Sequence, residues 1–130
     1  MRAFLFLLAV LTACTVPDKA SLNVMRQTRK LRKSPVTLKA YKSGEVTHDK
    51  LELRKNNSFA FQSNILGTQK CVFYAGTFAK NGDTLLLSFH NNYKDSLWTG
   101  AAVIDTLNKE ITLISKNPAS DNKMTITKLK

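Results

Sequence analysis

The chain has 130 residues, 43% of them hydrophobic, and a formal net charge of +11, which suits one small domain with its own core. The apolar run at residues 3–11 is too short to cross a bilayer by itself. The charge is uneven, because residues 15–40 hold seven Lys or Arg and one Asp, whereas residues 41–130 hold twelve Lys or Arg and eight Asp or Glu. We therefore expect the basicity to belong mostly to a segment that precedes the domain.

Residues 1–13 have the layout of a secretory signal peptide: Arg2, then the apolar run, then small residues before Cys14. The tetrapeptide Leu11-Thr-Ala-Cys14 resembles the lipobox of bacterial lipoproteins. This resemblance implies cleavage before Cys14, diacylglycerol on its sulfur and acylation of the new amino terminus. An ordinary secretory signal with a cysteine near its cleavage site is the alternative. Thr15 after the cysteine, where Asp would favour inner-membrane retention, favours the outer membrane of a bacterial envelope.

Lipidation would determine both the location of the protein and the state of its second cysteine. Two or three acyl chains hold a protein stably on a membrane, whereas one chain attaches it reversibly. If Cys14 carries lipid, Cys71 is left alone in a strand-like run at residues 70–75. We expect Cys71 to be a small buried apolar residue and not a nucleophile.

Residues 14–34 are predicted to be a flexible, lipidated basic tether, because they contain few large apolar residues and end at Pro35. A brief helix from Ser21 is the alternative, although no strong cap supports it. Near a surface the tether would attract anionic lipid or an envelope polymer, and a solvated spacer is the alternative. Nucleic acid is disfavoured, since the anchor lies outside the cytoplasm and no aromatic residues interleave with the basic ones. The basic residues concerned are Arg26, Arg29, Lys30, Arg32 and Lys33.

Residues 35–130 are predicted to be one all-β domain. Apolar and polar residues alternate at 36–41, 51–54, 59–61 and 84–89, and Asn81-Gly82 is a strong hairpin turn. Further strands are expected at 97–105, 110–116 and 123–129. With no helix expected inside the domain, about eight strands at short intervals indicate an antiparallel meander that closes into a small β-barrel.

The predicted strand at residues 71–80 is unusual because it is apolar on both faces. Gly76 lies within it, and we favour a β-bulge there that switches which face is turned inward. The alternative is a strand buried on both sides, with a helix or a partner over its outer face.

One pattern resembles a known group of proteins. It consists of Leu-x-Leu-x-x-Asn-Asn-x-Phe-x-Phe at 51–61, Gly-Thr-Phe at 76–78 and Asn-Gly-Asp-Thr-Leu-Leu-Leu at 81–87. This arrangement resembles the small lipocalin-like lipoproteins of bacterial envelopes, including those similar to the amino-terminal domain of the copper-response lipoprotein NlpE. The chain lacks the Cys-x-x-Cys pair common in that group, so the resemblance implies neither metal sensing nor thiol chemistry.

No sequence motif indicates an enzyme, a metal site or a cofactor. There is no Gly-x-Ser-x-Gly elbow and no glycine-rich phosphate loop, and His48, His90 and Cys71 lie far apart. We therefore expect a non-catalytic binding or interaction module anchored to the membrane. The alternative is a carrier of a small apolar ligand, with Tyr93 and Trp98 near the mouth of the barrel. A filled barrel is favoured because the residues expected to point inward are bulky: Leu51, Leu53, Phe59, Phe61, Tyr74, Phe78, Leu85, Leu87 and Phe89.

Overall fold

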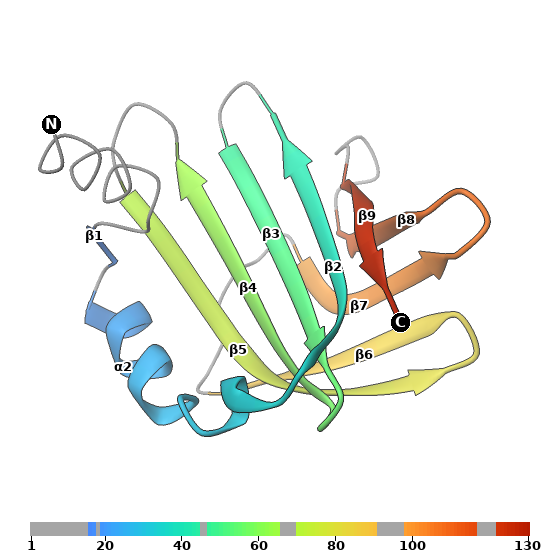
Figure 1. Cartoon of the computed structure of the whole chain (residues 1–130). Coiled ribbons are helices and arrows are strands. Elements are labelled where there is room, and N and C mark those ends of the chain that lie inside the picture. Colours follow the sequence, from blue (N-terminus) through green and yellow to red (C-terminus); the bar gives the residue numbers. More distant parts are fainter. Residues whose placement is uncertain (1–15, 18, 45–46, 66–69, 91–97, 117–121) are drawn as a thin grey trace, which may run out of the picture.

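The computed structural model describes residues 16–17, 19–44, 47–65, 70–90, 98–116 and 122–130 (Figure 1). The amino-terminal part consists of β1 (Val16–Pro17), α2 (Lys19–Gln27) and the short 3-10 helix η1 (Leu31–Lys33). The strands that follow are β2 (Val36–Ser43), β3 (Thr47–Arg54), β4 (Ser58–Ile65), β5 (Lys70–Asn81), β6 (Thr84–Phe89), β7 (Trp98–Asp105), β8 (Glu110–Ser115) and β9 (Lys123–Leu129).

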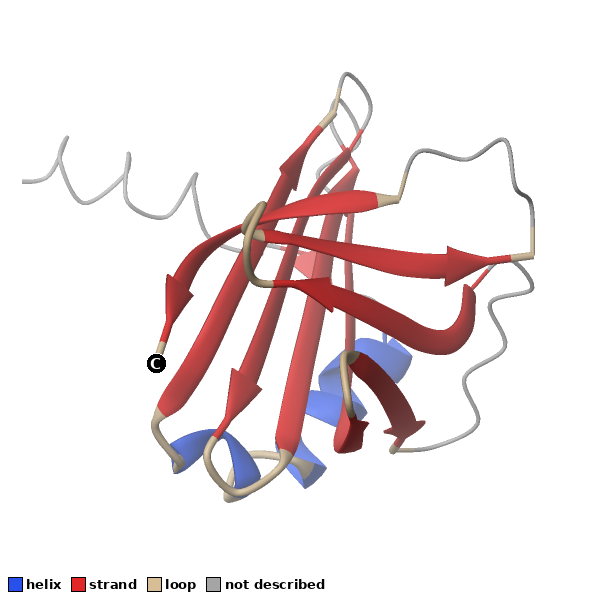
Figure 2. Cartoon of the chain, turned by 90° about the vertical axis from the view of Figure 1, so that its right-hand side faces the viewer, coloured by secondary structure: helices blue, strands red, loops and turns tan. Residues whose placement is uncertain are grey.

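Strands β2 to β9 form a closed antiparallel barrel, which confirms the predicted fold class. The sheet order runs β5-β4-β3-β2-β9-β8-β7-β6, and an additional β5–β6 pairing closes it. Figure 2 shows β7 and β8 crossing the long strands β2–β5 at a steep angle. The eight strands fall at the predicted places because most of them alternate apolar and polar residues and are bounded by turns, whereas β5 is apolar on both faces. In two of these turns Asn57 and Gly82 adopt positive φ angles of 62° and 61°.

The core lies inside the barrel and is built from the inward residues of every strand. All nine residues predicted to point inward belong to it: five are buried, and Tyr74, Phe78, Leu87 and Phe89 pack against it while partly exposed. Phe59 and Phe89 meet edge to face with ring centroids 5.2 Å apart. The other buried members are Leu38, Ala40, Ala102, Ile104, Ile111, Met124 and Ile126.

The favoured bulge at Gly76 is wrong. Strand β5 pairs with β4 and with β6 through this residue without any shift of register. Gly76 is required for another reason, because a Cβ atom there would lie 1.9 Å from the backbone oxygen of Ser88. The outer face of β5 is buried instead, as Phe73 and Ala75 pack with Val24 of α2. The alternative interpretation, a strand covered on both sides, is the correct one.

The expectation of a flexible tether is corrected for residues 19–34. Figure 1 shows α2 lying alongside β5, and η1 leading into β2. Helix α2 turns Ser21 and Val24 toward the sheet, while Leu22 stays 40% exposed. The short strand β1 pairs in parallel with the start of β5, with Pro17 opposite Cys71. The segment folds because the apolar outer face of β5 supplies the burial that the segment lacks by itself. No helix among the described residues is long and apolar enough to cross a membrane.

Candidate functional site

The predicted basic residues do not share one environment. Arg26, Arg29, Lys30 and Lys33 are exposed around the end of α2 and η1. Arg32 instead turns inward, where its Nη2 donates a 2.6 Å hydrogen bond to a backbone carbonyl of α2. Together with the exposed Lys19, the four exposed residues make a surface that we call the basic α2 face.

Arg32 attaches this segment to the barrel. Its guanidinium carbon lies 5.2 Å from the centre of the Phe73 ring on the outer side of β5, a cation–π contact. Burial, followed by the neighbouring charges of Arg54 and Arg29, lowers the pKa of Arg32 from its ordinary value. An arginine stays protonated despite such a shift, so Arg32 remains a cation held against an aromatic ring.

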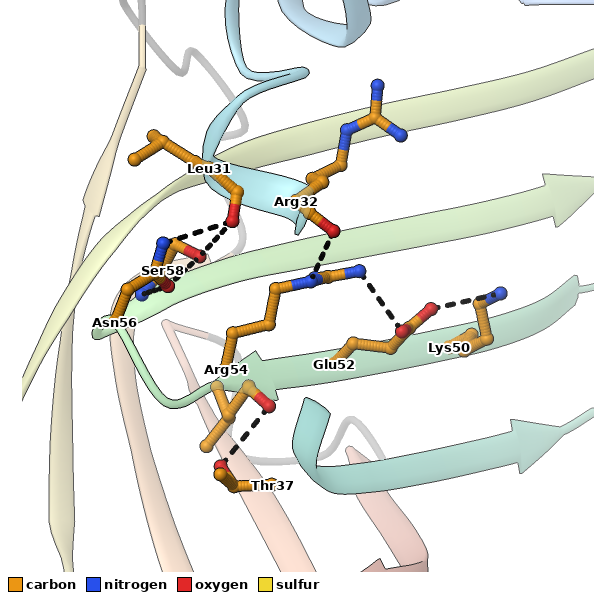
Figure 3. Close-up of polar contacts among 9 residues, drawn as sticks. Leu31, Arg32, Thr37, Lys50, Glu52, Arg54, Asn56 and Ser58 are labelled. Carbon is orange, nitrogen blue, oxygen red and sulfur yellow. Dashed lines mark hydrogen bonds and ion pairs between the residues drawn. The ribbon is translucent and has the colours of Figure 1, made fainter. Parts of the chain in front are cut away.

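Arg54 was missed in the sequence, where it reads as an outward residue at the end of a strand. It is 8% exposed, and Figure 3 shows it reaching from β3 to η1. Its Nε donates to the Arg32 carbonyl at 3.2 Å, and its Nη2 contacts Glu52 at 3.3 Å. Lys50 pairs with the other oxygen of Glu52 at 3.2 Å. The Glu52 carboxylate therefore pairs with both Arg54 and Lys50. These pairs stabilise its charge on the outer face beside η1.

The β3–β4 turn holds the other side of η1. The Nδ2 of Asn56 donates to the Leu31 carbonyl at 3.0 Å, and the Oγ of Ser58 contacts the same oxygen at 3.3 Å (Figure 3). The Oγ of Ser58 also donates to Asn56 Oδ1 at 2.6 Å. Leu31 is the first residue of η1, and its carbonyl also accepts from the Ser34 N–H at 3.4 Å, so these bonds tie η1 to the β3–β4 turn just before β2.

Helix α2 is also joined to the barrel by two polar contacts, of which the one to Phe73 is buried and the one to His90 is exposed. The backbone N–H of Phe73 donates to Ser21 Oγ at 3.0 Å, and His90 Nε2 lies 2.6 Å from Gln27 Oε1. The Oγ1 of Thr28, which is fully buried, donates to the Val24 carbonyl at 2.6 Å. The basic α2 face is therefore carried on a segment fixed at several points.

The bonding states of the two cysteines are linked, because Cys14 cannot both carry lipid and take part in a disulfide. Cys71 is 2% exposed, which confirms the expected burial, and in the chain described here it is disulfide-bonded. The lone Cys71 thiol is expected for the lipidated form and stays a prediction for that form. The only other cysteine of the sequence is Cys14, which lies outside the described residues. A sulfur that carries diacylglycerol cannot also form a disulfide. Lipidation of Cys14, which requires removal of residues 1–13, would therefore leave Cys71 as a buried thiol.

A second polar group lies on the inner side of the barrel wall. Asp49 and Ser63 follow the inward alternation of β3 and β4 and pair across the strands. Ser63 Oγ donates to Asp49 Oδ1 at 2.6 Å, and both residues are partly buried. Lys42, in register with Asp49 on β2, shares this inner face. The core is thus apolar around Leu51 and polar toward this end of the wall.

The outer side of β6, β7 and β8 carries apolar side chains in the open. Leu86, Val103 and Ile114 are 54%, 38% and 39% exposed. Thr84 pairs with Val103, and Leu86 pairs with Ala101, so these residues adjoin across the strands. We call this surface the outer β6–β8 face. This face could be recognised in the sequence, because Thr, Leu, Val and Ile occupy outward positions of these strands where polar residues are usual.

The remaining candidates from the sequence are Tyr93, Trp98 and the two histidines, and Tyr93 and Trp98 stay a prediction for the mouth of the barrel. Tyr93 lies outside the described residues, and Trp98 begins β7 opposite Ser115. His48 and His90 are both exposed. Within the described ranges no three His, Cys, Asp or Glu side chains gather in a way that would hold a metal ion.

Comparisons with known proteins add no relative. No protein-family model matches the chain, no curated protein is similar to it, and no solved structure matches its fold.

Proposed function

We propose that this protein is a lipid-anchored lipoprotein of a bacterial envelope, more specifically of the outer membrane, and that it acts as a non-catalytic interaction module. The anchor is Cys14, as its lipobox-like context suggests. The lipocalin-like and NlpE-like resemblance agrees with a small barrel in this setting and stays part of the proposal.

One observation carries the binding role. Inside the barrel, large side chains pack on one another, whereas Leu86, Val103 and Ile114 are exposed on its outside. A packed interior favours recognition on the exterior over transport of a ligand within. Exposed neighbouring apolar residues are typical of surfaces that contact a protein partner. We assign that contact to the outer β6–β8 face.

The experiment is site-specific photo-crosslinking in intact cells, with a benzoyl-phenylalanine in place of Val103. The expected result is a protein adduct that is lost when Ile114→Glu places a charge on the same face. A matched control, Thr77→Glu, alters an exposed residue of β5 and keeps the adduct. A Cys14→Ala chain should lose the adduct if the anchor brings the two partners together.

The outcome that would refute the interaction module is equally definite. If position 103 gives no adduct and the purified protein carries a small apolar molecule, the protein is the carrier that the sequence left as an alternative. Variants with an altered core, such as Phe61→Ala, would then lose that molecule, whereas Ile114→Glu would retain it.

A further inference from the structure

The folded chain begins very close to the proposed anchor. Val16 is already paired with β5, and it lies two residues after Cys14 in the sequence. Two residues span at most about 7 Å when fully extended. If Cys14 carries lipid, the edge of the barrel formed by β1, β5 and α2 therefore lies at the membrane surface. This step rests on the proposed anchor.

The segment that forms much of that edge is strongly basic. Residues 16–44 contain eight Lys or Arg and one acidic residue, Asp18. The basic α2 face exposes five of them, and Leu22 lies among them at 40% exposure. Electrostatic attraction in salt acts over about 8 Å, so these charges interact with lipid headgroups only when α2 lies against the surface, an arrangement that so short an anchor allows.

The described acidic residues lie elsewhere. Asp83 belongs to the β5–β6 turn, and Asp105 and Glu110 belong to the β7–β8 hairpin. Asp49 is on the inner wall, and Glu52 is paired beneath η1. Figure 1 shows α2 on the opposite side of the barrel from β7 and β8. The molecule therefore has a basic side next to its proposed anchor and an acidic hairpin away from it.

We propose that the basic α2 face lies flat on an anionic bilayer and that this contact orients the barrel, with the outer β6–β8 face directed away from the membrane. Arg32 and Arg54 keep α2 and η1 in place, so the charges act as a rigid surface. Each basic residue near anionic lipid strengthens the contact about fivefold. Removing three of them should weaken it on the order of a hundredfold.

The test uses the acylated mature protein, residues 14–130, purified from membranes and reconstituted in phosphatidylcholine vesicles with or without phosphatidylglycerol. A nitroxide label is placed at Asn23→Cys on α2 or at Leu107→Cys, a residue that is 94% exposed in the β7–β8 turn. Access of a water-soluble nickel chelate is measured by electron paramagnetic resonance. On phosphatidylglycerol vesicles the label at 23 should be severalfold less accessible than the label at 107.

Variants that remove charge test whether the basic residues cause the shielding of the label at position 23. Replacing Arg26, Arg29 and Lys30 together with Gln should restore access at position 23. The matched triple variant Lys80→Gln, Lys109→Gln and Lys116→Gln, away from α2, should leave it shielded.

Three outcomes distinguish failure of the orientation from failure of the anchor. Equal access at 23 and 107 on protein that stays bound to phosphatidylglycerol vesicles would overturn the orientation and leave the anchor intact. Shielding that persists in the α2 triple variant would also overturn it. Protein that is purified from membranes without an acyl group on Cys14 would overturn the proposed anchor, and with it this inference.

Discussion

Gly76→Ala tests whether β5 pairs with β6 at residue 76 without a bulge. The added Cβ would lie 1.9 Å from the Ser88 oxygen, whereas ordinary contacts are 3.4–4 Å. Strands β5 and β6 would have to part by about 1.5 Å. That movement also strains the 2.7 Å hydrogen bond from the His90 N–H to the Ala75 carbonyl.

The expected cost follows from these two effects. Overpacking costs about 1–3 kcal/mol, and a lost hydrogen bond costs about 1 kcal/mol. Gly76→Ala should therefore lower the free energy of unfolding by about 2–4 kcal/mol, a large share of the roughly 5–15 kcal/mol of a typical domain. Gly82→Ala is the control, since its Cβ would meet nothing within 4 Å. Its positive φ should cost only about 1–2 kcal/mol.

The assay is urea unfolding followed by circular dichroism, with both variants compared at equal m-values. If Gly76→Ala proved no more destabilising than Gly82→Ala, the continuous pairing of β5 with β6 would be wrong. A bulge that moves residue 76 away from Ser88 would then be the better description.

Three further predictions concern the attached segment and one turn. Val24→Ala should cost about 1–3 kcal/mol in urea unfolding and raise hydrogen exchange in α2, because its side chain fills the contact with Phe73. Arg54→Ala should cost about 2–3 kcal/mol and expose residues 31–33 to exchange, since the Arg32 carbonyl loses its partner; unchanged exchange there would contradict the role of Arg54. The Asn108 backbone N–H and side chain lower the pKa of Asp105 from 3.8, and this favours the folded state above that value and is lost as the pH falls below it. The destabilisation by Asp105→Ala at pH 7 should therefore shrink in unfolding measured near pH 2, and a loss independent of pH would refute it.

Much of the barrel could be predicted from local pattern alone. Leu51 and Leu53 alternate with polar residues, and Asn81-Gly82 marks a turn, so strands and hairpins follow without tertiary information. The inward set also follows, since a strand presents every second residue to one side. These signals depend only on neighbouring residues.

The attached segment could not be predicted in the same way. Helix α2 buries Val24 and Ser21, a small and partly polar contact that gives no strong periodic signal. Its partner is the outer face of β5, where Phe73 and Ala75 show in the sequence as apolar residues, but the local pattern does not say which segment covers them. The burial of Arg54 likewise depends on η1. Lys33, the last residue of η1, precedes Arg54 by 21 residues. Long-range contacts of this kind leave no mark on the local pattern.

Lipidation of Cys14 can be tested by mass spectrometry of the amino-terminal peptide of protein extracted from membranes. Thiols are alkylated beforehand under denaturing, non-reducing conditions. For a lipid-anchored protein we expect a chain that begins at Cys14 with diacylglycerol on its sulfur, together with an alkylated Cys71. A chain that begins elsewhere, or one in which Cys14 and Cys71 form a disulfide, would contradict it.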